Sequence, residues 1–437
     1  MGTAAQFRWS CPQTPTGPDG QVPTTGTVAH IAKLPTLGNL AIWATSAKLE
    51  AMVVTAEAER AILEQGMVQL AGILGPDFEV APYQVDGTEE VEHDDIGADA
   101  VYSVRAVQSS APYAQLIVEA RSSLAPAAAK DVLFHQVRLL RRLHGQATGL
   151  VIAPWLSPRT REVLVNRKIS FLDLTGNIDL HLPRNGILIR TDGAQRDPNP
   201  TPRRRSRGLS GASAGIVTRT LVDFKPPYRQ KDVAAVAGVS PGYVSRVFQA
   251  LDDEALITRD GHVITDVEWQ SLLRARAENY DVLRSNHAVP MVSRKSPEMV
   301  YRSLVDHETK NTTVVTGSYA AREIAPIAVG GPLMIYVDPM EGARQIDDLA
   351  EELSLLRAGD APGNIILLRP QNRGPLLRFH KFGATARVGL SQLVMDCLSG
   401  PGRMAQEAEA VLAYMAANES KWRRGRGQLA EVAASLA

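Results

Sequence analysis

The chain has 437 residues, of which 44% are hydrophobic and 22% charged, a composition that is typical of globular protein and argues against wholesale disorder. Lysine plus arginine and aspartate plus glutamate number 47 each, so any affinity for nucleic acid has to come from local charge and not from net charge. The two cysteines, Cys11 and Cys397, argue against a disulfide framework and against a cysteine-based zinc site.

The length predicts two or three domains, each with a core of its own. Residues 1–35 are rich in Gly, Pro, Thr and Gln and are expected to form a mobile leader. The N-terminus lacks an apolar signal core, and no apolar run approaches the roughly 18 residues that a membrane span needs. We therefore expect a cytoplasmic protein without membrane contact.

Residues 36–192 have the pattern of an α/β domain. A helical pattern runs from Leu40 to Leu74 and stops at Gly75-Pro76. Residues 86–99 then carry seven acidic residues in fourteen, which indicates a solvated loop. Farther along, Ser157 is expected to cap a helix that has Pro158 in its first turn. The predicted strands are residues 101–107, 115–120, 149–153, 169–174 and 186–190, and the remaining predicted helix is residues 131–143.

Residues 193–208 have the composition of a linker that carries a basic cluster. Prolines alternate through residues 197–202, and four arginines follow: Arg203, Arg204, Arg205 and Arg207. From Arg203 to Leu251 there are nine lysines or arginines and two acidic residues, a local excess of seven positive charges. Such an excess in a neutral chain is the electrostatic footprint of nucleic-acid binding.

Residues 230–249, QKDVAAVAGVSPGYVSRVFQ, predict a helix, a tight turn and a second helix. Ala234 suits a close helix crossing, Gly238 suits the turn, and Val239, Val244 and Val247 are expected to pack inward. This stretch resembles the helix-turn-helix of bacterial transcription regulators.

Residues 256–265 continue with two β-rich runs joined at Asp260-Gly261, which predicts a hairpin. With the helix pair it looks like a winged helix over residues 209–284, a fold that serves in DNA binding and also in protein–protein contacts. The second helix, residues 241–251, is expected to enter the major groove. The predicted DNA contacts are Ser240, Tyr243, Ser245, Arg246 and Gln249 around the second helix, Arg229 and Lys231 at the first, Arg259 and His262 at the wing, and the linker residues Arg203, Arg204, Arg205 and Arg207.

Within the first α/β block, Asp99 and Glu119 resemble the metal-binding pair of the PD-(D/E)xK nucleases, a restriction-endonuclease-like fold. That resemblance implies that Asp99 and Glu119 would hold a hard cation such as Mg²⁺ in an active enzyme. The catalytic lysine position holds Arg121, which stays protonated, and Ala98 replaces the proline of the motif. We therefore expect a degenerate nuclease-like domain without catalysis and without a cofactor.

Residues 285–425 predict a second α/β domain, followed by a tail at residues 426–437. Its Gly317-Ser318 turn and Asp338 loosely resemble nucleotidyltransferases, but Tyr336 occupies the position of their first carboxylate, so nucleotidyl transfer is not expected. The predicted helices reach from Ser296-Pro297 to Val305 and cover residues 319–324, 346–356 and 406–418, and the predicted strands are residues 312–316, 333–337 and 364–368.

Together with residues 169–177, this last block is similar to regulators of the abortive-infection type IV antitoxin group, which repress the promoter of a nucleotidyltransferase-like toxin. The chain is thus expected to be a bacterial, sequence-specific transcription regulator, a repressor or antitoxin-like protein that is not an enzyme. Its expected partners are double-stranded DNA, a second copy in a homodimer, and a toxin or other protein. The alternatives are a metal-dependent nuclease targeted by its winged helix and a non-catalytic interaction component of a defence or prophage system.

Overall fold

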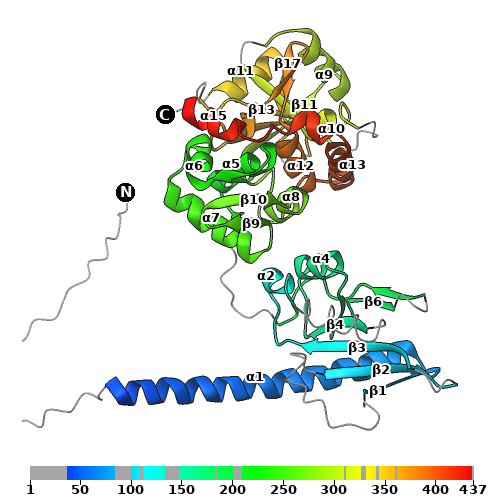
Figure 1. Ribbon diagram of the computed structural model, residues 1–437. Helices are drawn as coiled ribbons and strands as arrows, with labels where there is room; N and C mark the ends of the chain where they lie inside the picture. Colours follow the sequence, from blue (N-terminus) through cyan, green and yellow to red (C-terminus); the bar gives the residue numbers. More distant parts are fainter. Residues whose placement is uncertain are drawn as a thin grey trace, which may run out of the picture. The chain divides into compact units, whose positions relative to one another are not determined.

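The computed structural model describes residues 37–83, 100–108, 112–132, 147–182, 186–199, 209–309, 312–325, 331–340, 344–359 and 362–435 (Figure 1). Contacts within the chain divide it into two units, residues 1–56 and 57–437. Helix α1 (Leu37–Leu74) belongs to both and confirms the helix predicted from Leu40. It ends at Gly75, whose φ of +80° is a conformation that glycine adopts without strain. The predicted leader and acidic run lie outside the described residues.

The first sheet has seven strands in chain order. β3, β4 and β5 run parallel to one another, and the remaining neighbours are antiparallel. The strands are β1 (Phe78–Pro82), β2 (Ala100–Ala106), β3 (Pro112–Ala120), β4 (Ala147–Ala153), β5 (Ser170–Asp173), β6 (Ile178–Leu182) and β7 (Ile187–Thr191). All five predicted strands are present, whereas β1 and β6 were not expected.

Both faces of this sheet are buried. Leu116 and Val118 contribute to one hydrophobic cluster with Met67 and Leu70 of α1, while Ile117 contributes to another on the opposite face. The second cluster includes α4 (Pro158–Asn166), and the short helix α2 (Pro126–Ala129) lies with it. A strand that is covered on both faces needs a continuous apolar run, and this is why the sequence of β3 and β4 predicted them well.

Ser157 caps α4 as expected, because its hydroxyl accepts a hydrogen bond from the Thr160 amide at 3.1 Å. Of the helix predicted at residues 131–143, only residues 131 and 132 are described, and they form a turn.

Residues 209–284 contain four helices around a three-stranded sheet of order β8-β10-β9 (Figure 1). The helix pair and the hairpin predicted from the sequence are both present. The elements in chain order are α5 (Ala212–Asp223), β8 (Tyr228–Arg229), α6 (Gln230–Ala237), α7 (Pro241–Asp253), β9 (Ile257–Asp260), β10 (Val263–Val267) and α8 (Trp269–Ala277). Gly238 joins α6 to α7 at φ +62°, and Gly261 joins β9 to β10 at φ +57°.

The third sheet has seven strands of mixed direction, in the order β14-β11-β15-β13-β12-β17-β16. Parallel pairs join β13 to β15 and β12 to β17. Its strands are β11 (Asn286–Ser293), β12 (Thr313–Thr316), β13 (Leu333–Val337), β14 (Leu355–Arg357), β15 (Ile365–Pro370), β16 (His380–Phe382) and β17 (Thr385–Arg387). The chain is therefore a mixed α/β protein.

The helices of this last block are α9 (Pro297–Asp306), α10 (Gly317–Ala321), α11 (Gln345–Glu352), α12 (Leu390–Leu398), α13 (Met404–Ala417), α14 (Glu419–Trp422) and α15 (Gln428–Ser435), with a 3-10 turn η4 (Gly374–Leu376). Four of them, α9, α10, α11 and α13, correspond to predicted helices, whereas α12 and α14 were not expected. The helix predicted for residues 346–356 is too long, because Ser354 turns the chain at φ +56° and residues 355–357 enter β14.

The buried side chains from Leu209 to Leu429 form one hydrophobic cluster, so α5 to α8 and the third sheet share a core. α12 packs against both α5 and α8. Residues 428–435, assigned to a tail from the sequence, form α15, which packs on α6 with Leu429 and Ala433 buried. Of the helices that the structure describes, none combines the length and the apolar composition needed to cross a membrane.

Candidate functional site

The N-terminal half of α7 presents a polar face to solvent. Ser240 is its N-cap, and the hydroxyl accepts from the Tyr243 amide at 3.3 Å. Val244 and Val247 are buried, whereas Ser245 and Arg246 are exposed. Because apolar residues recur at intervals of three and four, one side of α7 packs into the core while the other remains free for a partner.

Arg246 is the most available cation on this face. It forms no ion pair in the described part of the chain, and its guanidinium lies 5.9 Å from the centre of the Tyr243 ring. Tyr243 is half-buried. Burial raises the pKa of the Tyr243 phenol, opposed by the nearby charges of Arg276 and Arg246, so the phenol stays protonated at neutral pH. Tyr243 can therefore donate a hydrogen bond as well as accept one.

The C-terminal half of α7 has a different character. Gln249 donates to Asp253 at 2.8 Å, and Arg259 of the hairpin pairs with Asp252 at 2.6 Å. These carboxylates occupy the donors of two predicted contact residues and add negative charge where a phosphate would approach. Arg246, in the first half of α7, is therefore a cation near this helix that no carboxylate neutralises among the described residues.

Three further predicted residues lie at the start of α6 and at the hairpin turn. Arg229, Lys231 and His262 are exposed, and neither Arg229 nor Lys231 has an ion pair among the described residues. Backbone contacts hold this corner together, since the Gln230 amide donates to the His262 carbonyl at 3.4 Å. The Gln230 side chain also donates to the Pro241 carbonyl at 2.9 Å, which ties the start of α6 to the start of α7.

This corner borders the last helix. Arg229 and Lys231 line an open hollow whose other wall includes Ala430 and Ala433 of α15. The predicted linker contacts Arg203, Arg204, Arg205 and Arg207 lie outside the residues that the structure describes.

The nuclease-like pair is only half described, because Asp99 lies outside the described residues. Glu119 is buried and forms an ion pair with Arg121, whose other terminal nitrogen lies 3.9 Å from Glu59. Among the described residues, there is no group of three or more His, Cys, Asp or Glu side chains that could hold a metal ion. Arg121 therefore neutralises the carboxylate that the resemblance assigns to a metal.

The residues of the nucleotidyltransferase-like pattern are interior. Tyr336 is fully buried and its hydroxyl donates to Asp396 at 3.1 Å. Ser318 is also buried, and Asp338 pairs with Arg373 at 2.6 Å. Tyr336 thus serves a buried polar network, and Asp338 serves an ion pair.

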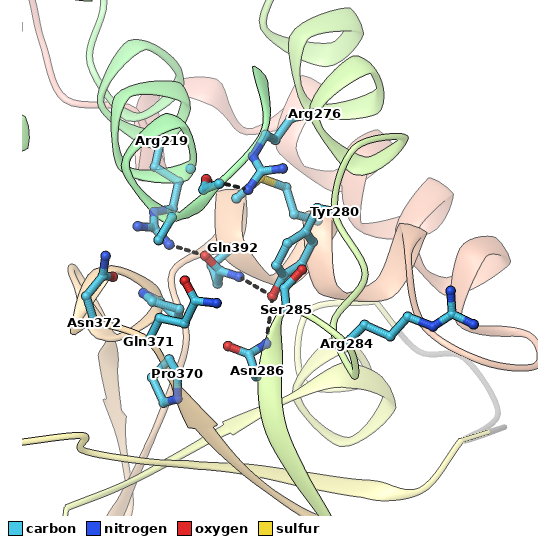
Figure 2. Close-up of a pocket in the computed structure, with 15 residues that line it drawn as sticks. Arg219, Arg276, Tyr280, Arg284, Ser285, Asn286, Pro370, Gln371, Asn372 and Gln392 are labelled. Atoms are coloured by element: carbon cyan, nitrogen blue, oxygen red, sulfur yellow. Dashed lines mark hydrogen bonds between the residues drawn. The ribbon is translucent and has the colours of Figure 1, made fainter. Parts of the chain in front are cut away.

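A second site did not emerge from the sequence. A cavity of about 290 Å³ lies between the α5–α8 region and the third sheet, and Figure 2 shows Arg219 and Arg276 on one side of it and Gln371 and Asn372 on the other. Its walls come from α5, the end of α8, the start of β11, the end of β15 and α12. No sequence motif joins such distant segments; the only signal is an arginine, Arg219, on a helix that is otherwise largely apolar.

A comparison of this chain with protein families, with characterised proteins and with solved structures finds no match.

Proposed function

We propose that this protein is a sequence-specific DNA-binding transcription regulator of the repressor or antitoxin-like kind. In this proposal α5, β8, α6, α7 and the β9–β10 hairpin form a winged helix, with α7 in the major groove and the hairpin as the wing. The supporting observation is that Arg229, Lys231 and Arg246 are exposed cations without ion pairs in the described part of a neutral chain, on neighbouring elements.

The contacts of α7 lie in its first two turns. Arg246 and Tyr243 would reach base edges, and Ser245 a base or phosphate, because the N-terminal residues of a recognition helix contact bases. Ser240 already accepts a hydrogen bond from its own helix, but its O–H remains able to donate to a phosphate. Arg229, Lys231 and His262 would hold phosphates, as would the linker arginines.

The remaining parts of the proposal concern assembly and the flanking sheets. A homodimer would match a palindromic operator. We assign the first sheet to a nuclease-like fold that has lost catalysis, because Arg121 neutralises Glu119. The third sheet would be a nucleotidyltransferase-like remnant, with Tyr336 in place of a carboxylate. A bacterial cytoplasm is where such a regulator would act.

The test is selection of binding sequences from random double-stranded DNA by the full chain, followed by anisotropy titration of a selected and a scrambled duplex. We expect the selected duplex to bind at least about 10³-fold more tightly at physiological salt. Equal affinity for both duplexes, or no retained DNA, would refute sequence-specific regulation.

A further inference from the structure

The cavity between α5 and the third sheet has a strongly asymmetric charge. Its lining includes no acidic residue and three arginines: Arg219, Arg276 and the exposed Arg284, which pairs with Asp281 at 3.7 Å outside the lining. Arg219 is 2% exposed and Arg276 is 4% exposed, and the Nε atoms of both are buried without a hydrogen-bond partner. Neither arginine forms an ion pair within the described residues.

Among the described residues, the two buried guanidiniums donate hydrogen bonds only to neutral groups. Arg219 donates to the Gln392 side chain, and Arg276 donates to the carbonyls of Asn279 and Gly211, each at 3.0 Å. Burial lowers the pKa of Arg219 to about 10, helped by the charge of Arg378, although Asp223 and Asp396 oppose it. A buried charge that is not paired directly with a carboxylate is unfavourable, so an anion in the cavity would compensate both arginines.

The start of α5 adds a third positive feature to the same space. Gly211 and Ala212 line the cavity, and the Gly211 N-cap offers no side chain to the first amides of this twelve-residue helix. Free amides and the helix dipole at such an end favour an anion. Ala212 and Gly215 are small residues, and a Cβ at position 215 would lie in ordinary van der Waals contact with Nη2 of Arg276, at 3.4 Å.

The cavity adjoins a more open hollow that adds one arginine without an ion pair among the described residues, Arg369, because Arg373 pairs with Asp338. The two share six lining residues, from Arg284 to Asn286 and from Pro370 to Asn372, and the hollow adds His287, Arg369 and Arg373. The hollow lies where the parallel strands β13 and β15 end, and the cavity borders the end of β15. The carboxyl edge of parallel strands is where α/β proteins bind ligands.

We propose that this cavity binds a small organic phosphate monoester, with the phosphate between Arg219, Arg276 and the start of α5. A phosphate carries more than one negative charge, which suits two arginines and a helix end better than a single carboxylate does. The amides of Gln371 and Asn372, on the opposite wall, would hydrogen-bond a hydroxylated or heterocyclic body (Figure 2). A volume of 290 Å³ equals about ten water molecules at about 30 Å³ each, enough for such a body.

The test is calorimetric titration of the full chain, without DNA, with inorganic phosphate, ribose, ribose 5-phosphate and adenosine 5′-monophosphate. We expect one or both organic phosphates to bind more tightly than inorganic phosphate, and ribose not to bind. Preference between the two organic phosphates identifies the body as a sugar or a nucleoside. Because the assay contains no DNA, its outcome is independent of the proposed regulator function.

Four variants locate the binding. Arg219→Met and Arg276→Met should each weaken it by about 10- to 100-fold, the loss of a charge-assisted hydrogen bond. Arg302→Met, a matched change on the exposed face of α9, should retain the parent affinity. Ala212→Leu keeps both arginines and fills the cavity, so it should abolish phosphate binding. This variant tests the location of the site if an arginine variant fails to fold.

Two results would overturn the assignment. One is a dissociation constant weaker than about 1 mM for every phosphate probe with the parent chain. The other is binding that Ala212→Leu and the folded arginine variants leave unchanged, because the phosphate would then be held elsewhere.

Discussion

Two arginines on the proposed DNA face have unlike surroundings. Arg246 has no ion pair among the described residues, whereas Arg259 is bound by Asp252 at 2.6 Å. The same side chain therefore offers a free charge at one position and a neutralised one at the other, and Asp252 decides the difference. At the residue scale, Asp252 is expected to oppose DNA binding.

Replacement of Asp252 by asparagine should strengthen DNA binding several-fold, because it removes a negative charge and releases Arg259 for a phosphate. The plot of log affinity against log salt should also steepen by about one unit, the value for one added phosphate contact. Anisotropy titration over a range of salt concentrations measures both. Unchanged or weaker binding would show that Arg259 lies away from the DNA.

Asp396 lies in the core and accepts a hydrogen bond from Gln392, a residue that lines the cavity. It is fully buried and accepts hydrogen bonds from Thr316 at 2.6 Å, Gln392 at 2.7 Å and Tyr280 at 2.8 Å. Burial raises the pKa of Asp396 above its ordinary value of 3.8, although these donors oppose the shift. The folded state therefore holds this proton more tightly than the unfolded state does.

A raised folded pKa gives stability that is present below the ordinary pKa and is lost as pH rises through the folded pKa. Asp396→Asn has a neutral amide that resembles the protonated carboxyl. The stability of this variant therefore does not fall as the pH rises through the folded pKa of Asp396. Its free energy of unfolding, relative to the parent, should rise as pH increases above about 4, by about 1.4 kcal/mol for each unit of pKa shift. Urea denaturation across this range measures the difference, and a pH-independent difference would contradict the shift.

At the element scale, the α6–α7 turn depends on one backbone conformation. Gly238 has φ +62°, and nothing lies within 4 Å of the place that a Cβ would occupy, so only strain opposes a side chain there. Gly242, inside α7, also has open space and an ordinary φ. The two glycines therefore separate backbone strain from steric fit.

Gly238→Ala should lower the free energy of unfolding by about 1 kcal/mol, because alanine is strained at positive φ. Gly242→Ala should raise it by about 0.5 kcal/mol, because alanine loses less backbone entropy in a helix. Chemical denaturation of both variants provides the comparison. A loss of stability at position 242 equal to that at position 238 would contradict the assignment of strain to the turn.

Elements that carry their own local signal could be predicted from the sequence. The apolar runs of β3 and β4, the cap at Ser157 and the glycine of the α6–α7 turn all act within a few residues. β8 has only two residues and exists because Tyr228 and Arg229 pair with β10, a partner that lies far along the chain. The prediction that the helix starting at residue 346 continues to residue 356 is wrong, because no residue near Ser354 signals the turn that ends α11.

The candidate site also has some features that the sequence predicts and others that depend on distant partners. The exposure of Lys231 and Arg246 follows from helical periodicity. The pairing of Arg259 with Asp252 has no signal in the sequence, so Arg246 and Arg259 are equivalent at that level. Arg219 adds to the local positive excess, yet it is buried in the cavity and cannot contribute to a DNA surface. Charge counts along a sequence do not distinguish a surface cation from an interior one.

At the scale of the whole molecule, the proposed DNA surface and the proposed phosphate site rest on one core. The hydrophobic cluster shared by α5 to α8 and the third sheet supports α7 and also includes Met395, which lines the cavity. Arg276 borders the cavity, and its charge also opposes the rise in the pKa of Tyr243 on α7. Arg276 is thus close to both proposed sites.

The most direct test of the regulator proposal compares Arg246→Ala with Lys231→Ala on a selected and a scrambled duplex. Loss of a base contact should cost Arg246→Ala about 1–3 kcal/mol on the selected duplex alone and so reduce the ratio of the two affinities. Lys231→Ala should weaken both duplexes alike and flatten the salt dependence by about one unit. Equal losses from the two variants, with the ratio of affinities unchanged, would contradict base reading by α7.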